Sequence, residues 1–339
     1  MRKVVEKGCV HAGMVVRPAT GVLNDCDIVS PLHSGSMAIQ APLSARHPDG
    51  LIPSGQLWLP HAGLSACVRG TIVRSTLGHA LSDEERINRF PATPLCSLSW
   101  WFTGRSECLV PERPGSMPDL NSPREPFAGR WVLAGPQTRP STSWCAEPTH
   151  AMMVMFMPDA LHLLTGLAPE HLTDRTVDAT TLLPRDWLAL CEAVQHQPDD
   201  AARMECLEQF LLPRWQACRP GAATATQRYA DWATHLAQRA AHSAPGRSLR
   251  QLERRIKRWA GLPLRELRGF GKAEQAFFDT LAADAAESPV RWAEVATGAG
   301  FSDQSHLCRV TRRITGYAPQ ALYDGIQRDE AFWVYRIWV

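Results

Sequence analysis

The sequence contains no run of about 18 consecutive apolar residues, which is the length that an α-helix needs to cross a bilayer. Residues 1–16 carry two early positive charges but only a short, interrupted apolar stretch, so they would make a poor signal peptide. These absences exclude a membrane-spanning helix. They predict a cytoplasmic protein without a membrane partner.

The ten cysteines include no Cys-x-x-Cys pair, and no group of Cys and His has zinc-finger spacing. The sequence therefore predicts no metal site. In a reducing compartment most of these thiols would be small buried hydrophobic groups. A thiol that senses oxidants stays open as an alternative, because a low thiol pKa cannot be recognised from sequence.

Motifs for catalysis are also lacking. The segment Gly63–Cys67 resembles a nucleophile elbow but has no closing glycine. There is no phosphate-binding loop and no helix with His and Glu at metal-binding spacing. Because no mutually supporting catalytic groups emerge, the sequence predicts no catalytic residue and no cofactor.

Net charge is small, at +2, but it is unevenly distributed. From Gly221 onward, 17 basic residues stand against 12 acidic ones, a balance of +5, whereas the preceding part has 19 against 22, a balance of −3. The 339 residues are enough for two domains with separate cores. A basic C-terminal part on a slightly acidic body is typical of a chain with one DNA-facing half.

The segment Arg291–Gly316 predicts two helices joined by a tight turn. The first helix has an apolar face at helical spacing, formed by Trp292, Val295, Ala296 and Ala299. Gly300 supplies the backbone conformation that ends a helix. Ser302 follows as the predicted N-cap of the second helix.

This second helix is amphipathic. Its inner side carries Leu307, Val310 and Ile314. Its outer side carries Gln304, Ser305, His306, Arg309, Arg312 and Arg313. Polar groups near the start and arginines further along suit a helix that reads the major groove. Taken alone, the stretch fits a solvated amphipathic helix equally well.

A second copy of the pattern favours DNA binding. The segment Gly246–Gly261 again has a glycine, a capping serine and a basic helix closed by glycine. Aligned on the closing glycines, the matched pairs are Leu252 with Leu307, Arg254 with Arg309, Lys257 with Arg312, and Arg258 with Arg313. The serines Ser248 and Ser302 match only if the second copy has one extra residue early in its helix. An internal duplication of this kind seldom arises by chance.

These two stretches resemble the paired helix-turn-helix domain of the AraC/XylS family of bacterial transcription regulators. The block Gly300–His306, followed by Thr315–Tyr317 and Pro319, is similar to the signature region of that family. The chain departs from the family at Leu307 and Thr311, where aromatic residues are usual.

The resemblance implies a sequence-specific transcription regulator, most often an activator, with double-stranded DNA and RNA polymerase as partners. It also implies an N-terminal sensor domain that responds to an unknown small-molecule effector or a partner. A homodimer is optional, because two reading helices lie in one chain. The rival readings are a thiol-responsive regulator and, less favoured, an enzyme domain fused to a DNA-binding tail.

The outward side chains of both helices are the candidate site residues. Those expected to contact base edges are Arg250, Gln251, Arg254, Gln304, Ser305, His306 and Arg309. Those expected to contact phosphate are Ser248, Lys257, Arg258, Ser302, Arg312 and Arg313.

The N-terminal part has the character of strands and loops. Predicted strands are Leu57–Pro60, Val68–Thr76, Leu95–Phe102 and the methionine run Met152–Met157. The segment Thr103–Gly129 is rich in Pro, Gly and Ser and is expected to be a loop. A helix capped by Asp159 should follow and end at Gly166.

Helical patterns dominate the remainder. Helices are expected at 184–196, 198–218, 229–241 and 264–286, the second of them packing into the core or forming a dimer. Gly269 and Gly271 should interrupt the last of these, which links the two units. The aromatic segment Ala331–Val339 should pack back onto the last helix or onto the sensor domain.

The predicted fold class is therefore α+β. A mixed, β-rich sensor domain with flanking helices would occupy residues 1–218. A linker over 219–227 would lead to an all-α DNA-binding domain, 228–339, with two helix-turn-helix units joined by a linker helix.

Overall fold

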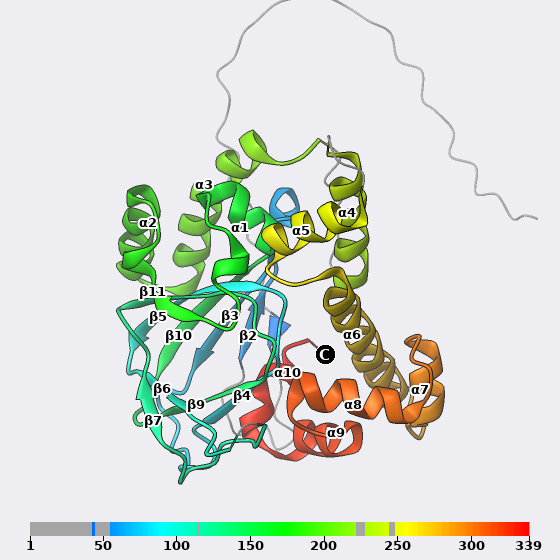
Figure 1. Cartoon of the computed structure of the whole chain (residues 1–339). Coiled ribbons are helices and arrows are strands. Elements are labelled where there is room, and N and C mark those ends of the chain that lie inside the picture. Colours follow the sequence, from blue (N-terminus) through cyan, green and yellow to red (C-terminus); the bar gives the residue numbers. More distant parts are fainter. Residues whose placement is uncertain (1–42, 45–54, 114, 222–227, 244–247, 339) are drawn as a thin grey trace, which may run out of the picture. The chain divides into compact units, whose positions relative to one another are not determined.

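The computed structural model describes residues 43–44, 55–113, 115–221, 228–243 and 248–338. Most of the predicted linker, together with Gly246, lies outside these ranges. The described part has a β-rich N-terminal region followed by a helical C-terminal region, which confirms the predicted α+β fold class (Figure 1).

The β-rich region contains two antiparallel sheets. The seven-stranded sheet has the order β1 (Leu43–Ser44), β2 (Gln56–Trp58), β3 (Val68–Ser75), β10 (His150–Phe156), β5 (Cys96–Thr103), β8 (Trp131–Ala134) and β11 (Thr176–Asp178). The four-stranded sheet has the order β4 (Ile87–Phe90), β9 (Ser141–Cys145), β6 (Ser106–Leu109) and β7 (Arg124–Pro126).

The methionine run forms the strand β10, as predicted. It pairs with β3 on one side and β5 on the other, and Met152, Val154 and Phe156 are buried. The prediction of a loop over Thr103–Gly129 was wrong, because β6 and β7 lie within it. Both strands are short and polar, and β6 owes its place to backbone pairing with the distant strand β9.

Three helices accompany the sheets: α1 (Pro158–Thr165), α2 (Arg185–Gln195) and α3 (Asp200–Cys218). Gly166 ends α1 in the left-handed conformation, as predicted, but Asp159 is not its cap. The cap position is Met157, and the buried Asp159 carboxylate instead accepts from the Trp232 indole N–H at 2.9 Å and pairs with Arg239. Asp159 therefore does not cap α1 but bonds to residues of the helical C-terminal region.

The helical region begins with α4 (Tyr229–His242), α5 (Leu249–Ala260) and α6 (Leu264–Ala285). It continues with α7 (Trp292–Gly298), α8 (Gln304–Thr315) and α9 (Pro319–Arg328). The predicted break at Gly269 and Gly271 was wrong, because α6 is continuous over 22 residues. A Cβ on Gly271 would lie 3.0 Å from the backbone of Ala230, so this glycine allows α4 and α6 to approach closely.

The C-terminal segment folds back onto the β-rich region, as predicted. It forms a 3₁₀ turn, Glu330–Phe332, and α10 (Trp333–Arg336), and nearly all its side chains are buried. The Trp333 indole N–H donates to Asn88 Oδ1 of β4 at 2.8 Å. One hydrophobic core therefore runs from the sheets through the helices, and a smaller cluster lies among α6, α7 and α8. Within the described ranges, no helix is both long and apolar enough to cross a membrane.

Candidate nucleic-acid interface

Helices α5 and α8 are built alike. Each has 12 residues, begins after a capping side chain and ends at a glycine with positive φ. The glycines are Gly261, at φ 77°, and Gly316, at φ 85°, and each donates its N–H to the carbonyl oxygen four residues earlier. Ser248 caps α5 by accepting from the Gln251 amide at 3.3 Å.

The second cap is Asp303, so the prediction of Ser302 was wrong. Asp303 Oδ1 accepts from the His306 amide at 2.7 Å, and the Ser302 hydroxyl donates to Asp303 Oδ2 at 3.0 Å. The amide hydrogen bond from His306, followed by that from Ser302, lowers the pKa of Asp303. A carboxylate is favoured over a hydroxyl here because it also interacts with the helix dipole.

This correction strengthens the duplication. Ser248 and Asp303 both immediately precede a 12-residue helix closed by glycine, so the copies align without an extra residue. In this register Arg250 matches Ser305, and Gln251 matches His306. The two helices are therefore equivalent in length, cap and phase.

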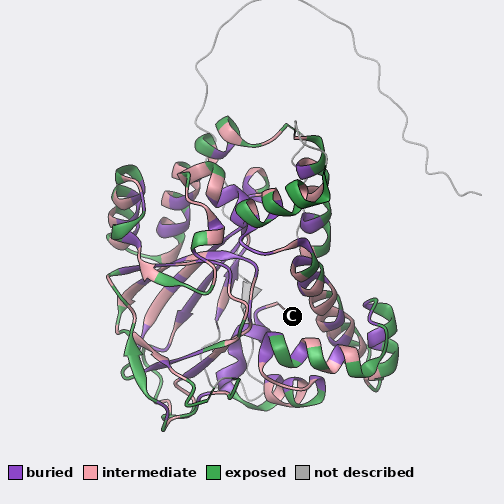
Figure 2. Cartoon of the chain, viewed as in Figure 1, coloured by how far each residue is buried: buried purple, intermediate pink, exposed green. Residues whose placement is uncertain are grey.

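The predicted contact residues lie on the outer faces of these helices. All are exposed except His306, which is half-buried with its ring edge-on to Phe301 at 5.3 Å between centroids. Arg313 lies 3.8 Å from Glu266, and the other basic side chains of the set form no ion pair within the described part of the chain. Figure 2 shows exposed and buried positions alternating along both helices. The opposite faces hold Ile256 and Leu307, which are buried.

The C-terminal ends of both helices are hydrogen-bonded to the β-rich region. The Ala92 amide donates to the carbonyl oxygen of Ile314 at the end of α8, at 2.7 Å. The Thr173 hydroxyl donates to the carbonyl oxygen of Gly261, just beyond α5, at 3.1 Å. Nothing in the sequence signals these contacts, because they join segments far apart in the chain.

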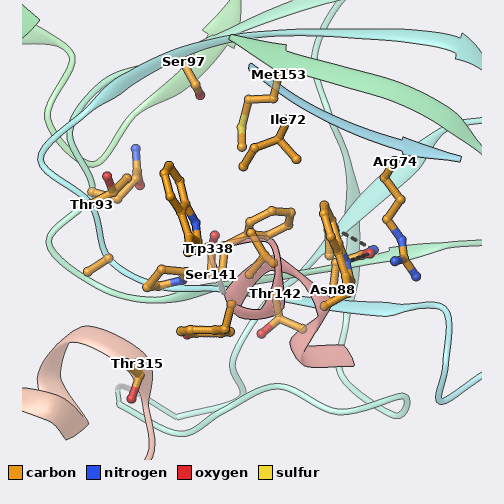
Figure 3. A pocket seen from close by; sticks show the side chains of 18 of the residues that line it. Ile72, Arg74, Asn88, Thr93, Ser97, Ser141, Thr142, Met153, Thr315 and Trp338 are labelled. Atoms are coloured by element: carbon orange, nitrogen blue, oxygen red, sulfur yellow. Dashed lines mark hydrogen bonds between the residues drawn. The ribbon is translucent and has the colours of Figure 1, made fainter. Parts of the chain in front are cut away.

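A cavity of about 670 Å³ lies beside α8. Its wall combines the strands β3, β4, β5, β9 and β10 with residues of α6, α8 and α9 and the C-terminal segment. Figure 3 shows Ile72, Ser97 and Met153 on one side of the space and Ser141 and Thr142 on another. Most of the wall is apolar and aromatic, which suits a small organic ligand.

The buried charged side chains of this wall each have a partner of opposite charge. Arg69 Nη2 lies 3.0 Å from Glu274 Oε1, and its guanidinium stacks on Trp338 at 4.7 Å. Arg74 Nη1 lies 2.8 Å from Glu330 Oε1. Burial raises the pKa of Glu274 and lowers that of Arg74, because desolvation disfavours both charged forms.

Six of the cysteines in the described part of the chain give no support to a redox sensor. Burial is the first cause of a raised pKa at Cys67, Cys96, Cys108, Cys191, Cys206 and Cys218, and it brings that of Cys191 to about 12. A thiolate, which is the reactive form, is therefore disfavoured at these positions. The described residues also contain no disulfide and no cluster of His, Cys, Asp and Glu that could hold a metal ion.

No family model matches the chain, and neither does any curated protein. Similar solved structures include ToxT from Vibrio cholerae. A single-residue variant of ToxT without ligand has a TM-score of 0.35 at 10% identity, over 74% of this chain and 96% of that chain. ToxT bound to (E)-4-(8-methylnaphthalen-1-yl)but-3-enoic acid has a TM-score of 0.32 at 12% identity, over the same shares. ToxT bound to an unsaturated fatty acid has a TM-score of 0.31 at 10% identity, over 69% and 93%. These TM-scores are too low for the similarity to indicate the function of this chain.

Proposed function

We propose that this chain is a sequence-specific DNA-binding transcription regulator of the AraC/XylS kind, acting as an activator and controlled by a small molecule in the cavity. The observation that carries the proposal is the pair α5 and α8, which match in length, cap and phase and expose basic and polar side chains. A purely structural helix has no need of such a repeated, solvent-facing pattern.

Each reading helix would enter a major groove. Arg and Gln near the helix start suit guanine and adenine edges, so Arg250, Gln251, Arg254 and, in α8, Gln304, Ser305, His306 and Arg309 are assigned to bases. The assignments to phosphate are Ser248, Lys257, Arg258, Ser302, Arg312 and Arg313.

The connecting helix supports a bipartite site. With 22 residues at about 1.5 Å each, α6 is about 33 Å long, which is comparable with one turn of B-DNA, about 34 Å. Two units in one chain would therefore occupy successive major grooves without a partner. A homodimer is optional, and activation would proceed through RNA polymerase.

Control would operate through the contacts at the ends of α5 and α8. The β-rich region binds both ends through Ala92 and Thr173, and the cavity wall includes Ile314 and Thr315 of α8. A ligand that favours one arrangement of this wall shifts the population of DNA-binding geometries. We assign sensing to residues 1–218, linkage to 219–227 and DNA binding to 228–339.

The test is selection of bound sequences from random duplex DNA with the full chain, followed by affinity measurements against salt. Two short enriched blocks about one helical turn apart are expected. Four basic phosphate contacts predict a slope of log affinity against log salt of about −4.

A double variant, Arg254→Ala with Arg309→Ala, should lose the enrichment. The matched control is Arg185→Ala, because Arg185 is an exposed arginine in α2. Weak binding with no enriched sequence and no difference between the two variants would refute the proposal.

A further inference from the structure

We infer that the ligand of the cavity is an uncharged molecule with an apolar body and hydroxyl or carbonyl groups. The inference names the chemical class of the effector and rests on the regulatory role proposed above. It follows from three features of the wall: its paired charges, its unpartnered hydroxyl groups and its overall apolar character.

Each buried charged side chain of the wall already has a partner of opposite charge. Arg69 pairs with Glu274, and Arg74 pairs with Glu330, so each of these guanidinium groups already has a carboxylate partner. Glu330 also pairs with a second cation, Arg336. Neither Glu330 nor Arg336 lines the cavity, and Arg336 also donates to the carbonyl oxygens of Ile326 and Asp329. The remaining charged groups of the wall are exposed or partly exposed residues at its rim, namely His79, Arg86, Glu147 and Asp174. An ion entering the interior would lose its hydration without gaining a free counter-charge.

Two buried hydroxyl groups in this wall have no hydrogen-bond partner among the described residues. They are Thr142 Oγ1, whose residue is 1% exposed, and Tyr335 Oη, whose residue is 6% exposed. The N–H of Arg69 Nε is a third such group. Because buried polar atoms nearly always have partners, these atoms become available to a ligand's own donors and acceptors once the wall adjusts around it.

Further hydroxyl groups face the same space from β5. This strand alternates, with Leu98 and Trp100 buried on one side and the half-buried Ser97 and Ser99 in the cavity wall on the other. Around them the wall is formed by apolar side chains, including Ile72, Phe90, Met153, Phe277 and Trp338. This combination of apolar walls with scattered neutral hydrogen-bonding groups suits a neutral amphiphile. At about 670 Å³ the space can hold a drug-sized molecule.

The test uses the purified full chain and a fluorescent, uncharged probe, Nile red, displaced by three competitors of equal chain length. These are decan-1-ol, decanoate and decylammonium, which differ in charge. Decan-1-ol should displace the probe at a concentration at least about tenfold lower than either ion, because an ion loses far more hydration free energy on entry than a hydroxyl group does. Displacement by either ion at an equal or lower concentration would overturn the inference.

Two conservative variants locate the binding. Thr142→Val and Tyr335→Phe remove an unpartnered hydroxyl and keep the shape of the side chain. Each variant should raise the melting temperature of the free protein, because it removes a buried hydroxyl that has no partner. Each should also weaken the binding of decan-1-ol about three- to tenfold, because the hydrogen bond to that hydroxyl is lost. The control is Thr165→Val in α1, whose hydroxyl donates to the Leu161 carbonyl outside the wall. It should lower the melting temperature and leave displacement unchanged.

If both variants raise the melting temperature and bind decan-1-ol as tightly as the parent, the assignment of the ligand groups is wrong. Displacement is measured without DNA, so it is independent of the DNA selection. A chain that prefers decan-1-ol but enriches no DNA sequence would refute the regulatory function alone. A chain that enriches DNA and prefers decanoate would refute the ligand class alone.

Discussion

Replacement of Glu330 by glutamine should destabilise the protein strongly. The Glu330 side chain is 2% exposed and joins two guanidinium groups, those of Arg74 and Arg336, whose side chains are 9% and 8% exposed. Burial lowers the pKa of both arginines, which reflects the free energy that their desolvation already costs in the folded state. The Glu330 carboxylate offsets this cost by its charge and hydrogen bonds.

Glutamine keeps the shape but leaves two buried cations close together with no anion. Breaking a buried ion pair by removing one partner costs about 3–5 kcal/mol, and this site has two cations rather than one. The expected loss for Glu330→Gln is therefore about 4 kcal/mol, a large fraction of the roughly 5–15 kcal/mol that stabilises a typical protein. Urea unfolding followed by far-ultraviolet circular dichroism measures it.

The matched control is Glu192→Gln. Glu192 lies 3.0 Å from Arg130, but both side chains are 46% exposed, so its loss should cost at most about 1 kcal/mol. Adding Arg336→Met to Glu330→Gln removes one of the two unmatched charges and should restore part of the stability. Equal unfolding midpoints for Glu330→Gln and Glu192→Gln would show that the buried cluster does not hold the C-terminal segment in place.

Arg309→Ala should cost about 1–3 kcal/mol of DNA-binding free energy and relax specificity at one base pair. Arg312→Ala should instead weaken binding to all DNA sequences alike. Competition with single-base variants of the selected site distinguishes the two effects. The pKa of Asp303 is depressed in the folded state, so its stabilising effect is present above the pKa of the unfolded chain and is lost as pH falls through the folded value. Faster exchange of the His306 amide hydrogen, relative to its intrinsic rate, at a pH below the pKa of the folded Asp303 carboxyl than at pH 6 would reveal this loss. The variant Asp303→Asn should show no such pH dependence. Cys191, with its pKa near 12, should resist iodoacetamide at pH 8 in the folded protein; prompt alkylation would reopen the thiol-sensing alternative.

The helices α5 and α8 could be predicted because their signals are local. Apolar spacing, the closing glycines and a polar residue before each helix are all present within a short stretch of sequence. The choice between Ser302 and Asp303 was not decided by these signals, because both residues are good caps. It depends on the helix phase that buries Leu307 against the cluster with Val295 and Phe301.

The β-rich region could be predicted only in part. The strands β3, β5 and β10 are apolar enough to be recognised, whereas β6 and β7 are short, polar and held by pairing with strands distant in sequence. Long-range ion pairs were not predictable either, as in Asp159 with Arg239, which are 80 residues apart. For the cavity the sequence contained one signal, the serines Ser97 and Ser99 alternating with buried residues in β5.

The composition suggests a domain boundary near residues 219–227. The parts of the chain before and after this boundary do not pack independently of each other. Arg69 in β3 pairs with Glu274 in α6, and Trp333 donates to Asn88, so buried polar contacts join the sheets to the helices. Removing the β-rich region would expose Glu274 and the aromatic C-terminal segment together. The proposed DNA-binding helices must therefore be studied in the full chain, since the contacts that position α8 belong to both regions.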